Sequence, residues 1–166
     1  MTDVVAALFR EYHESLVRML MRRTGDRDRA EEIAQETFAR AVVAPPRNPR
    51  PWLFAVALNL VREEGRRRVR QDRRLVLYKA EQDGASESPA DVMDRHGRIE
   101  SVRVALDTLS ERDRDALLLK AEGFSYDDIA ATLGLARGAV GTTLSRARRK
   151  LVEAYRDGEG ATDVAS

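Results

Sequence analysis

Residues 125–151 read SYDDIAATLGLARGAVGTTLSRARRKL, and this stretch decides the class of fold. Ser125 suits the N-cap of a short amphipathic helix, with Asp128 three residues on, as in a capping box. Gly134 then allows a tight turn. A second helix is expected from about Ala136, and its apolar residues recur at helical spacing: Val140, Leu144, Ala147, Leu151 and Ala154. Helix, glycine turn and helix together predict a helix-turn-helix.

The second of these helices is expected to carry hydroxyls and cations on its outward face, where a major groove would lie. Hydroxyls and arginines are suited to base edges, and cations near the helix end are suited to phosphates. A solvated helical hairpin is the alternative, but the run Ile-Ala-Ala-x-Leu-Gly-Leu favours DNA binding. The candidate DNA-reading residues are Arg137, Thr142, Thr143, Ser145, Arg146, Arg149 and Lys150.

Apolar residues recur at helical spacing through most of the remaining chain, and no useful stretch alternates as a strand does. A first helix should end near Thr24 and Gly25, since glycine suits a left-handed cap. Asp26 or Asp28 can cap the next helix. Its buried stripe is expected to be Ala30, Ile33, Ala34, Thr37, Phe38 and Ala41. Pro45 and Pro46 stop that helix, and a third begins around Pro49–Pro51.

The segment 81–94, EQDGASESPADVMD, is acidic and rich in glycine, serine and proline, which is typical of a flexible linker. The fold class expected is therefore all-α, with two small helical domains joined by this linker and the helix-turn-helix in the second. The boundaries expected are residues 1–80 for the first domain and 95–156 for the second. Residues 157–166 are small and polar and are expected to form a disordered tail.

The amino-acid composition argues against several classes of function. The chain has no cysteine and only two histidines, which excludes disulfides and thiolate sites and argues against a histidine-based metal or catalytic centre. We therefore expect no enzyme activity, cofactor or metal. Without a signal sequence or a long apolar run, a cytoplasmic protein without membrane insertion is expected. Net charge is +1, yet basic residues gather at 62–74 and 146–150, the pattern of phosphate contact.

Five stretches of the sequence together resemble the extracytoplasmic-function (ECF) sigma factors of the sigma-70 family. LSERDRDALLL at 109–119, EGFSYDDIA at 122–130 and GAVGTTLSRARRKL at 138–151 are similar to sigma region 4. RAEEIAQETF at 29–38 and PWLFAVALNL at 51–60, with the arginines after it, are similar to the core-binding and promoter-melting parts of region 2. The resemblance covers about residues 5–155, with both regions in the order and spacing of the family.

The resemblance implies a subunit that binds bacterial RNA polymerase core and promoter DNA, with an anti-sigma factor as a further partner. It places polymerase contacts on Glu31, Glu32, Gln35 and Glu36. It places contacts to the melted −10 element on Trp52, Asn59, Arg62, Arg66, Arg67, Arg68 and Arg70, with Asn59 beside a flipped base. Trp52 has a second interpretation as a core anchor, which its apolar neighbours favour. The helix-turn-helix would read the −35 element.

The sequence departs from the family pattern in three places. The loop 44–50 is short and rich in proline, Gly141-Thr142-Thr143 lacks the cation common there, and Ala136 stands where a serine or threonine cap is usual. Arg137 can compensate for the missing cation. Two other functions remain open: a mimic that sequesters an anti-sigma factor, and a helix-turn-helix repressor. The arginine clusters argue against the first, and Asn59 with the acidic helix argues against the second.

Overall fold

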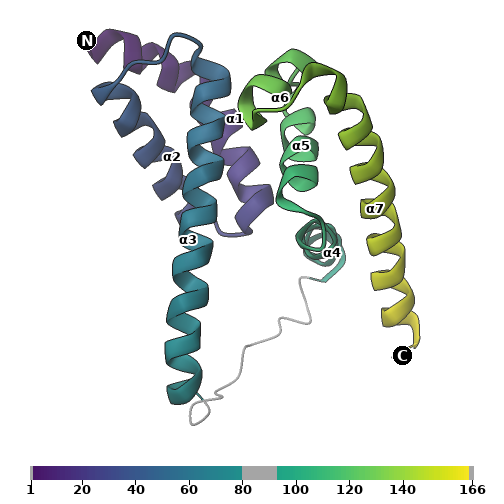
Figure 1. The fold of residues 1–166 in the computed structure, drawn as a ribbon. Coiled ribbons are helices and arrows are strands. Elements are labelled where there is room, and N and C mark those ends of the chain that lie inside the picture. The colour runs from purple at the N-terminus through teal and green to yellow at the C-terminus, as the bar shows by residue number, and fades with distance from the viewer. Residues whose placement is uncertain (1, 80–92, 165–166) are drawn as a thin grey trace.

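The computed structural model describes residues 2–79 and 93–164, and every regular element in these ranges is a helix. Three long helices form the first domain, and a shorter helix leads into three more in the second (Figure 1). In chain order they are α1 (Thr2–Thr24), α2 (Arg27–Val43), α3 (Pro49–Lys79), α4 (Met93–Asp107), α5 (Glu111–Ala121), α6 (Tyr126–Leu133) and α7 (Arg137–Val164). The expected all-α class is confirmed.

The end of α1 and the start of α2 are formed by the residues that the sequence predicted there. Gly25 adopts a left-handed φ of 70° after α1, and the Asp26 side chain caps α2 by accepting a hydrogen bond from the Arg29 amide at 3.2 Å. The Ala44 amide closes α2 on the carbonyl of Arg40. The buried residues of α2 are the six expected from the periodicity.

The second domain contains the expected helix-turn-helix, formed by α6 and α7. Ser125 caps α6 through a hydrogen bond from the Asp128 amide at 3.1 Å, and Gly134 ends it with φ 67°. Val140, Leu144 and Ala147 of α7 are fully buried, which turns the opposite side of that helix to solvent. The main long-range neighbours of α7 are α4, α5 and α6.

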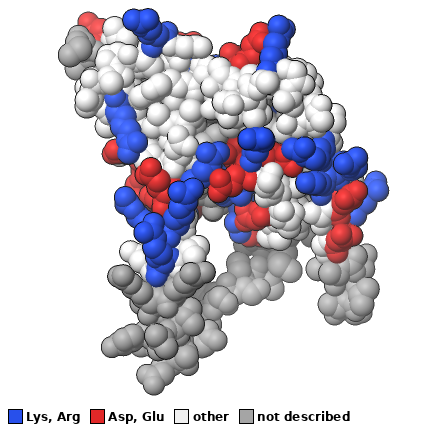
Figure 2. All heavy atoms as spheres, viewed as in Figure 1, with Lys and Arg blue, Asp and Glu red and all other residues white. Residues whose placement is uncertain are grey.

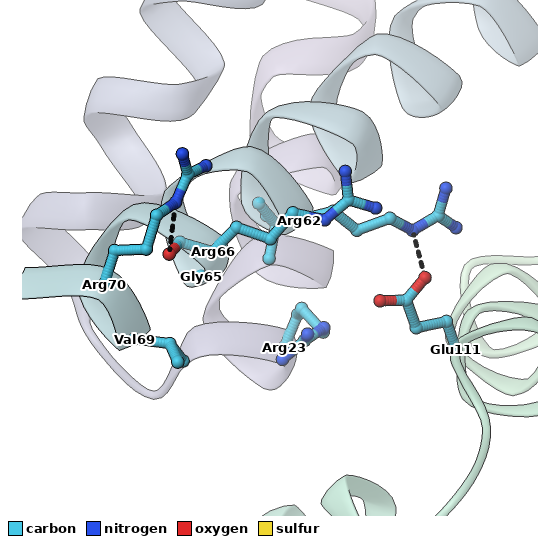
Figure 3. Close-up of a pocket in the computed structure, with 8 residues that line it drawn as sticks. Arg23, Arg62, Gly65, Arg66, Val69, Arg70 and Glu111 are labelled. Atoms are coloured by element: carbon cyan, nitrogen blue, oxygen red, sulfur yellow. Dashed lines mark hydrogen bonds and ion pairs between the residues drawn. The ribbon is translucent and has the colours of Figure 1, made fainter. Parts of the chain in front are cut away.

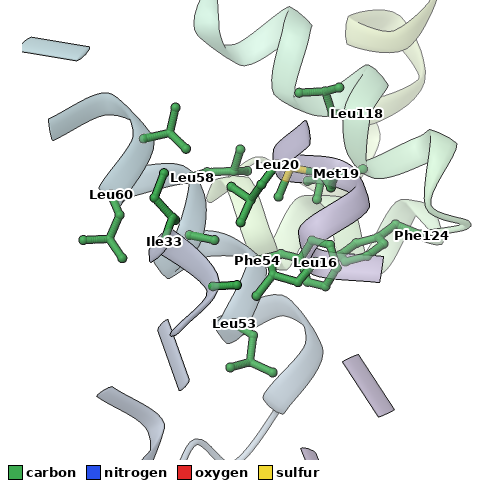
Figure 4. Packing of buried hydrophobic residues seen from close by; sticks show 14 of the residues in the cluster. Leu16, Met19, Leu20, Ile33, Leu53, Phe54, Leu58, Leu60, Leu118 and Phe124 are labelled. Atoms are coloured by element: carbon green, nitrogen blue, oxygen red, sulfur yellow. The ribbon is translucent and has the colours of Figure 1, made fainter. Parts of the chain in front are cut away.

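The two domains share one core. Phe54 of α3 and Phe124, just after α5, meet edge to face with their ring centroids 4.8 Å apart. Leu16, Met19 and Leu20 of α1 lie in the same cluster as Leu118 of α5 (Figure 4). The expected linker, 81–94, lies outside the described residues except for Met93 and Asp94, and these two belong to the first turn of α4 rather than to a linker.

The end of the chain differs from the expectation. The helix α7 continues to Val164, so residues 157–164 are helical where the sequence suggested a disordered tail. The length of α7 follows from the absence of proline after Pro89, and Gly158 and Gly160 are tolerated within it. None of the helices in the described ranges combines the length and apolar character needed to cross a bilayer.

Candidate nucleic-acid interface

The outward side of α7 carries most of the residues expected to read DNA. Thr142, Ser145 and Arg149 are exposed and follow one another at spacings of three and four, which places them along one face of the helix. Thr143 does not belong to that face. It is only 5% exposed, and its hydroxyl donates to the Ala139 carbonyl at 2.8 Å, so the expectation that it faces outward is wrong.

Arg146 is committed to a partner inside the domain. Its guanidinium donates to both oxygens of Asp113 in α5, at 2.8 and 3.3 Å, and the Lys150 ammonium lies 3.6 Å from the same carboxylate. The Asp113 side chain is 1% exposed. The hydrogen bond from Arg146 is the main reason that the pKa of Asp113 lies below its usual range. Arg146 therefore fastens α7 to α5.

The start of α7 is also tied to the rest of the motif. Arg137 forms an ion pair with Asp127 of α6 at 2.8 Å, in an exposed position that leaves the guanidinium within reach of solvent. Arg148 was not among the residues singled out from the sequence, although it is exposed on the same helix. Its place in the basic run 146–150 could have identified it as a candidate DNA contact. The helical spacing, however, did not assign it to a particular face of the helix.

Asn59 and Arg62 meet at the middle of α3, where the two domains touch. Asn59 is exposed, and its side-chain oxygen accepts a hydrogen bond from Arg62 at 3.0 Å. Both residues line a cavity of about 330 Å³ whose other wall is the last turn of α6, residues 131–134. Both also line a second cavity, of about 280 Å³, together with Glu111 and Arg66.

Further along α3, four arginines surround a larger hollow of about 570 Å³ (Figure 3). They are Arg62, Arg66 and Arg70 of α3 and Arg23 of α1, and Glu111 lies opposite them at the start of α5. Arg67 and Arg68 are exposed on the same helix but do not line this hollow. On the face drawn in Figure 2, basic side chains gather on α3 and on α7, with acidic side chains between them.

The acidic side chains of α5 hold Arg62. Arg62 is hydrogen-bonded to Asp115, and its Nε lies 3.3 Å from a carboxylate oxygen of Glu111. The Asp115 side chain is 1% exposed, and this burial raises the pKa of its carboxyl even though Arg62, Arg114 and Arg23 lie near it. No local pattern in the sequence revealed the arginines that contact Asp113 and Asp115.

Trp52 lies apart from Asn59, against α2. It is half-buried, packs on the core cluster and lines a groove of about 390 Å³ with Glu36, Ala39, Arg40 and Val43. Its position therefore agrees with the core-anchor interpretation while leaving part of the ring open beside the acidic helix.

The polar face of α2 is arranged as the sequence suggested. Glu32, Gln35 and Glu36 are exposed, and Glu31 is half-buried. Glu31 and Glu36 form ion pairs within the helix, with Arg27 and Arg40, each at 3.3 Å. Within the described part of the chain, Glu32 and Gln35 have no side-chain hydrogen bond or ion pair, which leaves them available to another molecule. No group of residues in the described ranges has the make-up of a metal site.

Comparison with known families accounts for both domains. The family model "Sigma-70 region 2" matches residues 8–71, and the model "Sigma-70, region 4" matches residues 99–151. A curated relative, the ECF RNA polymerase sigma factor EcfG of Rhodopseudomonas palustris, is 35% identical over 90% of this chain and 81% of its own. This chain belongs to the ECF sigma factors of the sigma-70 family.

Two further sigma factors are similar to this chain over most of its length. SigL of Mycobacterium tuberculosis is 35% identical over 89% of this chain and 86% of its own, and YlaC of Bacillus subtilis is 30% identical over 90% of each. Among solved structures, the sigma factor RpoE of Bartonella quintana, in complex with the anti-sigma factor NepR, superposes with a TM-score of 0.61 at 28% identity, covering 89% of this chain and 95% of that one. CnrH, in complex with the cytosolic domain of CnrY, shares the fold, with a TM-score of 0.65 at 22% identity, and covers 100% of this chain and 92% of its own.

Proposed function

We propose that this sigma factor brings RNA polymerase core to promoters through three separate surfaces, one each for core, the −10 element and the −35 element. Region 2 corresponds to α1–α3 and region 4 to α4–α7. The observation that supports this division best is the row of exposed side chains on α7, opposite its buried face of Val140, Leu144 and Ala147. A helix anchored in this way within a helix-turn-helix is suited to a major groove.

Recognition of the −35 element falls to Thr142, Ser145 and Arg149, with Arg148 and Lys150 toward phosphates. An arginine can form a bidentate contact with guanine, and hydroxyls contact several bases. Arg137 adds a cation at the front of the helix, where it must exchange its contact with Asp127 for one with DNA. Arg146 contributes by holding α7 against Asp113, as a positioning residue.

Recognition of the −10 element falls to Asn59 and the arginines of α3. The Asn59 amide is exposed beside two cavities, and an amide can pair with the edge of an unstacked base. Arg62, Arg66, Arg67, Arg68 and Arg70 follow along the helix and supply charge for the phosphates. Trp52 belongs to the neighbouring groove with α2 and has its main role in packing.

Polymerase core is bound by α2. Glu32 and Gln35 are its free polar side chains, and Glu31 and Glu36 can exchange the arginines of the same helix for basic residues of the partner. Such exposed intrahelical pairs are weak, so giving them up costs little. By analogy with RpoE in complex with NepR, we propose an anti-sigma factor as a further partner. Nucleotide transfer belongs to the polymerase, so this chain needs no enzymatic chemistry, and it acts in the cytoplasm.

The proposal is tested with purified protein, RNA polymerase core and promoter templates selected from a random library. Arg149→Ala should weaken binding to duplex promoters by about 1–3 kcal/mol if Arg149 contacts a base in bidentate fashion. It should matter less on a template with a premelted bubble. Asn59→Ala should show the reverse pattern, with lost discrimination on single-stranded −10 DNA. Equal losses of both variants on both templates would contradict the division between a duplex reader and a strand-capture site.

A further inference from the structure

The hollow of about 570 Å³ between α1, α3 and α5 has walls dominated by arginines (Figure 3). Arg62, Arg66 and Arg70 follow one another at intervals of four residues, which places them along one face of α3. Arg23 of α1 and Glu111 of α5 line the other sides. Four arginines therefore stand against a single carboxylate, in a space of the size that small-molecule sites have.

Arg23 is a largely buried cation whose charge is incompletely balanced inside the protein. Its side chain is 18% exposed, and among the described residues its ion-pair partner is Asp107, at 3.7 Å. Asp107 is shared with Arg103 and Arg114, at 3.3 and 3.9 Å. The pKa of Arg23 is lowered mainly by its burial and then by the positive charge of Arg114. An anion in the hollow would supply the negative charge that Arg23 lacks.

Arg66 and Arg70 also have positive charge that the protein leaves unpaired. Within the described ranges neither guanidinium forms an ion pair, and that of Arg70 donates a hydrogen bond to the Arg66 carbonyl at 3.4 Å. Like charges four residues apart on a helix repel each other, and an anion between them would relieve this repulsion. Arg62 differs, because it is already paired with Asp115 and Glu111.

Gly65 keeps the space between these arginines open. It lies within α3, where glycine is less favourable than alanine. A Cβ added to it would meet no described atom within 4 Å outside its own stretch of helix, so a longer side chain there would enter the hollow. Val61 and Val69, one turn before and one turn after Gly65, give the hollow an apolar edge.

We infer that this hollow binds a small molecule through a polyphosphate group, either free or carried by a nucleoside. A terminal phosphoryl group carries about −1.5 to −2 charges near pH 7, whereas each phosphate of a nucleic acid carries one. Linked phosphoryl groups thus match a compact cluster of arginines, which bind phosphoryl oxygens through paired hydrogen bonds. Walls from three helices favour such a compact group over a strand that must enter and leave.

Binding in the hollow has a consequence for promoter melting, which, unlike the binding itself, rests on the proposed function. Arg66 and Arg70 are assigned there to the phosphates of the −10 strand. These guanidinium groups cannot pair with a polyphosphate and with the strand at the same time. The ligand would therefore compete with single-stranded DNA for α3.

The site is tested by calorimetric titration of the full chain with inorganic pyrophosphate at constant ionic strength. Arg66→Gln combined with Arg70→Gln should weaken binding about tenfold or more, because it removes charge-assisted hydrogen bonds. The matched control combines Arg67→Gln with Arg68→Gln, which removes the same charge from exposed positions of α3 outside the hollow. It should weaken binding less than about twofold, since salt screens such charges. Equal losses in the two double variants, or no binding by the wild type, would overturn the proposal.

A change that keeps every charge gives an independent answer. Gly65→Leu should fill the hollow and weaken pyrophosphate binding about tenfold or more, since it displaces the ligand from its arginines. Gly97→Leu in α4 is the control, because a Cβ there also meets no described atom within 4 Å, and it should bind as the wild type does. Circular dichroism compares the helix content of the two variants. Wild-type affinity in Gly65→Leu would overturn the site, and if this variant unfolds, the arginine variants decide.

Two further probes identify the chemistry of the ligand. Inorganic phosphate should bind about tenfold more weakly than pyrophosphate, because it offers fewer charged oxygens. Equal affinities for the two would contradict a polyphosphate site. Adenosine diphosphate that binds more tightly than pyrophosphate would identify a nucleotide with its base against Val61 and Val69, and weaker binding would identify a free polyphosphate.

Competition with a labelled, random-sequence single-stranded DNA tests the consequence for α3. Saturating pyrophosphate should displace this DNA from the wild type, and from the Gly65→Leu variant it should displace much less. Pyrophosphate that binds in the hollow without displacing DNA would keep the site and contradict the role of Arg66 and Arg70 in −10 binding. The two proposals therefore fail separately.

Discussion

Arg146 has a contact within the protein that its place in the recognition helix did not predict. Its two hydrogen bonds to Asp113 fasten the recognition helix to α5, and Lys150 places a second positive group on the same carboxylate. The carboxylate is buried, so removing Arg146 would leave Asp113 short of a partner. Arg146→Ala is therefore expected to reduce DNA binding and stability together, which makes Arg149 the better probe of base contact.

The Asp113 pair also predicts a pH dependence of stability. The pKa of Asp113 is lowered in the folded protein, mainly by the hydrogen bond from Arg146, so its contribution is present above the unfolded pKa of about 4 and is lost as pH falls through the folded pKa. Asp113→Asn should lower Tm by a few degrees at pH 7, and the gap to wild type should close as pH falls below about 4. Thermal unfolding measured across pH checks this.

Glu153→Gln is the control for that series, because Glu153 is an exposed carboxylate on α7. Its Tm should follow the wild type at every pH. A gap between Asp113→Asn and wild type that stays constant down to acidic pH would mean that the pair with Arg146 adds no stability through ionisation.

Individual residues could be assigned from sequence where local chemistry decides their position. Ser125, Asp26 and Gly134 were correctly placed at helix ends, since capping depends on neighbours within a few residues. Thr143 was misplaced because a hydroxyl that bonds back to its own helix can be buried at low cost. The partners of Arg62 and Arg146 come from distant parts of the chain, and no local pattern identifies them.

At the scale of single helices, α2 offers the clearest test of polymerase binding. Glu32→Lys should weaken the complex with core about tenfold or more, because it reverses a charge on an exposed face without removing core volume. Gln35→Ala should have a smaller effect of the same sign. Affinity is measured by competition with another sigma factor for core, and helix content by circular dichroism.

Glu153→Lys makes the same change of charge on α7, away from α2, and should leave core affinity unchanged. If Glu32→Lys and Gln35→Ala both bind core like the wild type, the interface with core lies on another element.

The short helix α6 depends on its cap. It has only eight residues, and Ser125 satisfies one of its free amides through the hydrogen bond from Asp128. Ser125→Ala should cost about 1 kcal/mol of unfolding free energy and weaken duplex binding, because α6 supports the recognition helix. Ser101→Ala, which removes a hydroxyl from the middle of α4, should cost less in chemical denaturation. Equal effects of the two changes would show that the cap does not stabilise α6.

The positions of the helices were the feature of this fold that the sequence predicted best. The buried stripe of α2 and the turn between α6 and α7 follow from periodicity and from glycine and proline, all of which act locally. The length of α7 was underestimated because small polar residues in 157–164 suggested a tail, and composition alone does not fix where a long helix ends.

At the scale of the whole molecule, the sequence indicated two domains but not the contact between them. In the sequence, Glu122 and Phe124 belong to a stretch similar to sigma region 4, and nothing there indicates their partners. Phe124 joins the shared core, and Glu122 forms ion pairs with two arginines of α1. The surface of contact depends on how two folded units fit, and neither unit's own periodicity contains that information. The contact between the two domains is for this reason the part of the molecule that only the structure reveals.

Limited proteolysis tests both the linker and the contact between the two domains. A protease that cleaves after glutamate should cut first within 81–94, at Glu81 or Glu87, because this acidic segment, rich in glycine, serine and proline, offers little to pack. Glu122 should resist, since its side chain is 1% exposed. Arg50 of α3 donates a hydrogen bond to the Glu122 carbonyl at 2.9 Å, so Arg50→Ala should speed the later cut at Glu122 relative to the exposed control Arg47→Ala, because cleavage needs local opening. Uniform resistance across 81–94 would mean that this segment is packed, and equal rates at Glu122 in the two variants would mean that Arg50 does not hold the domains together.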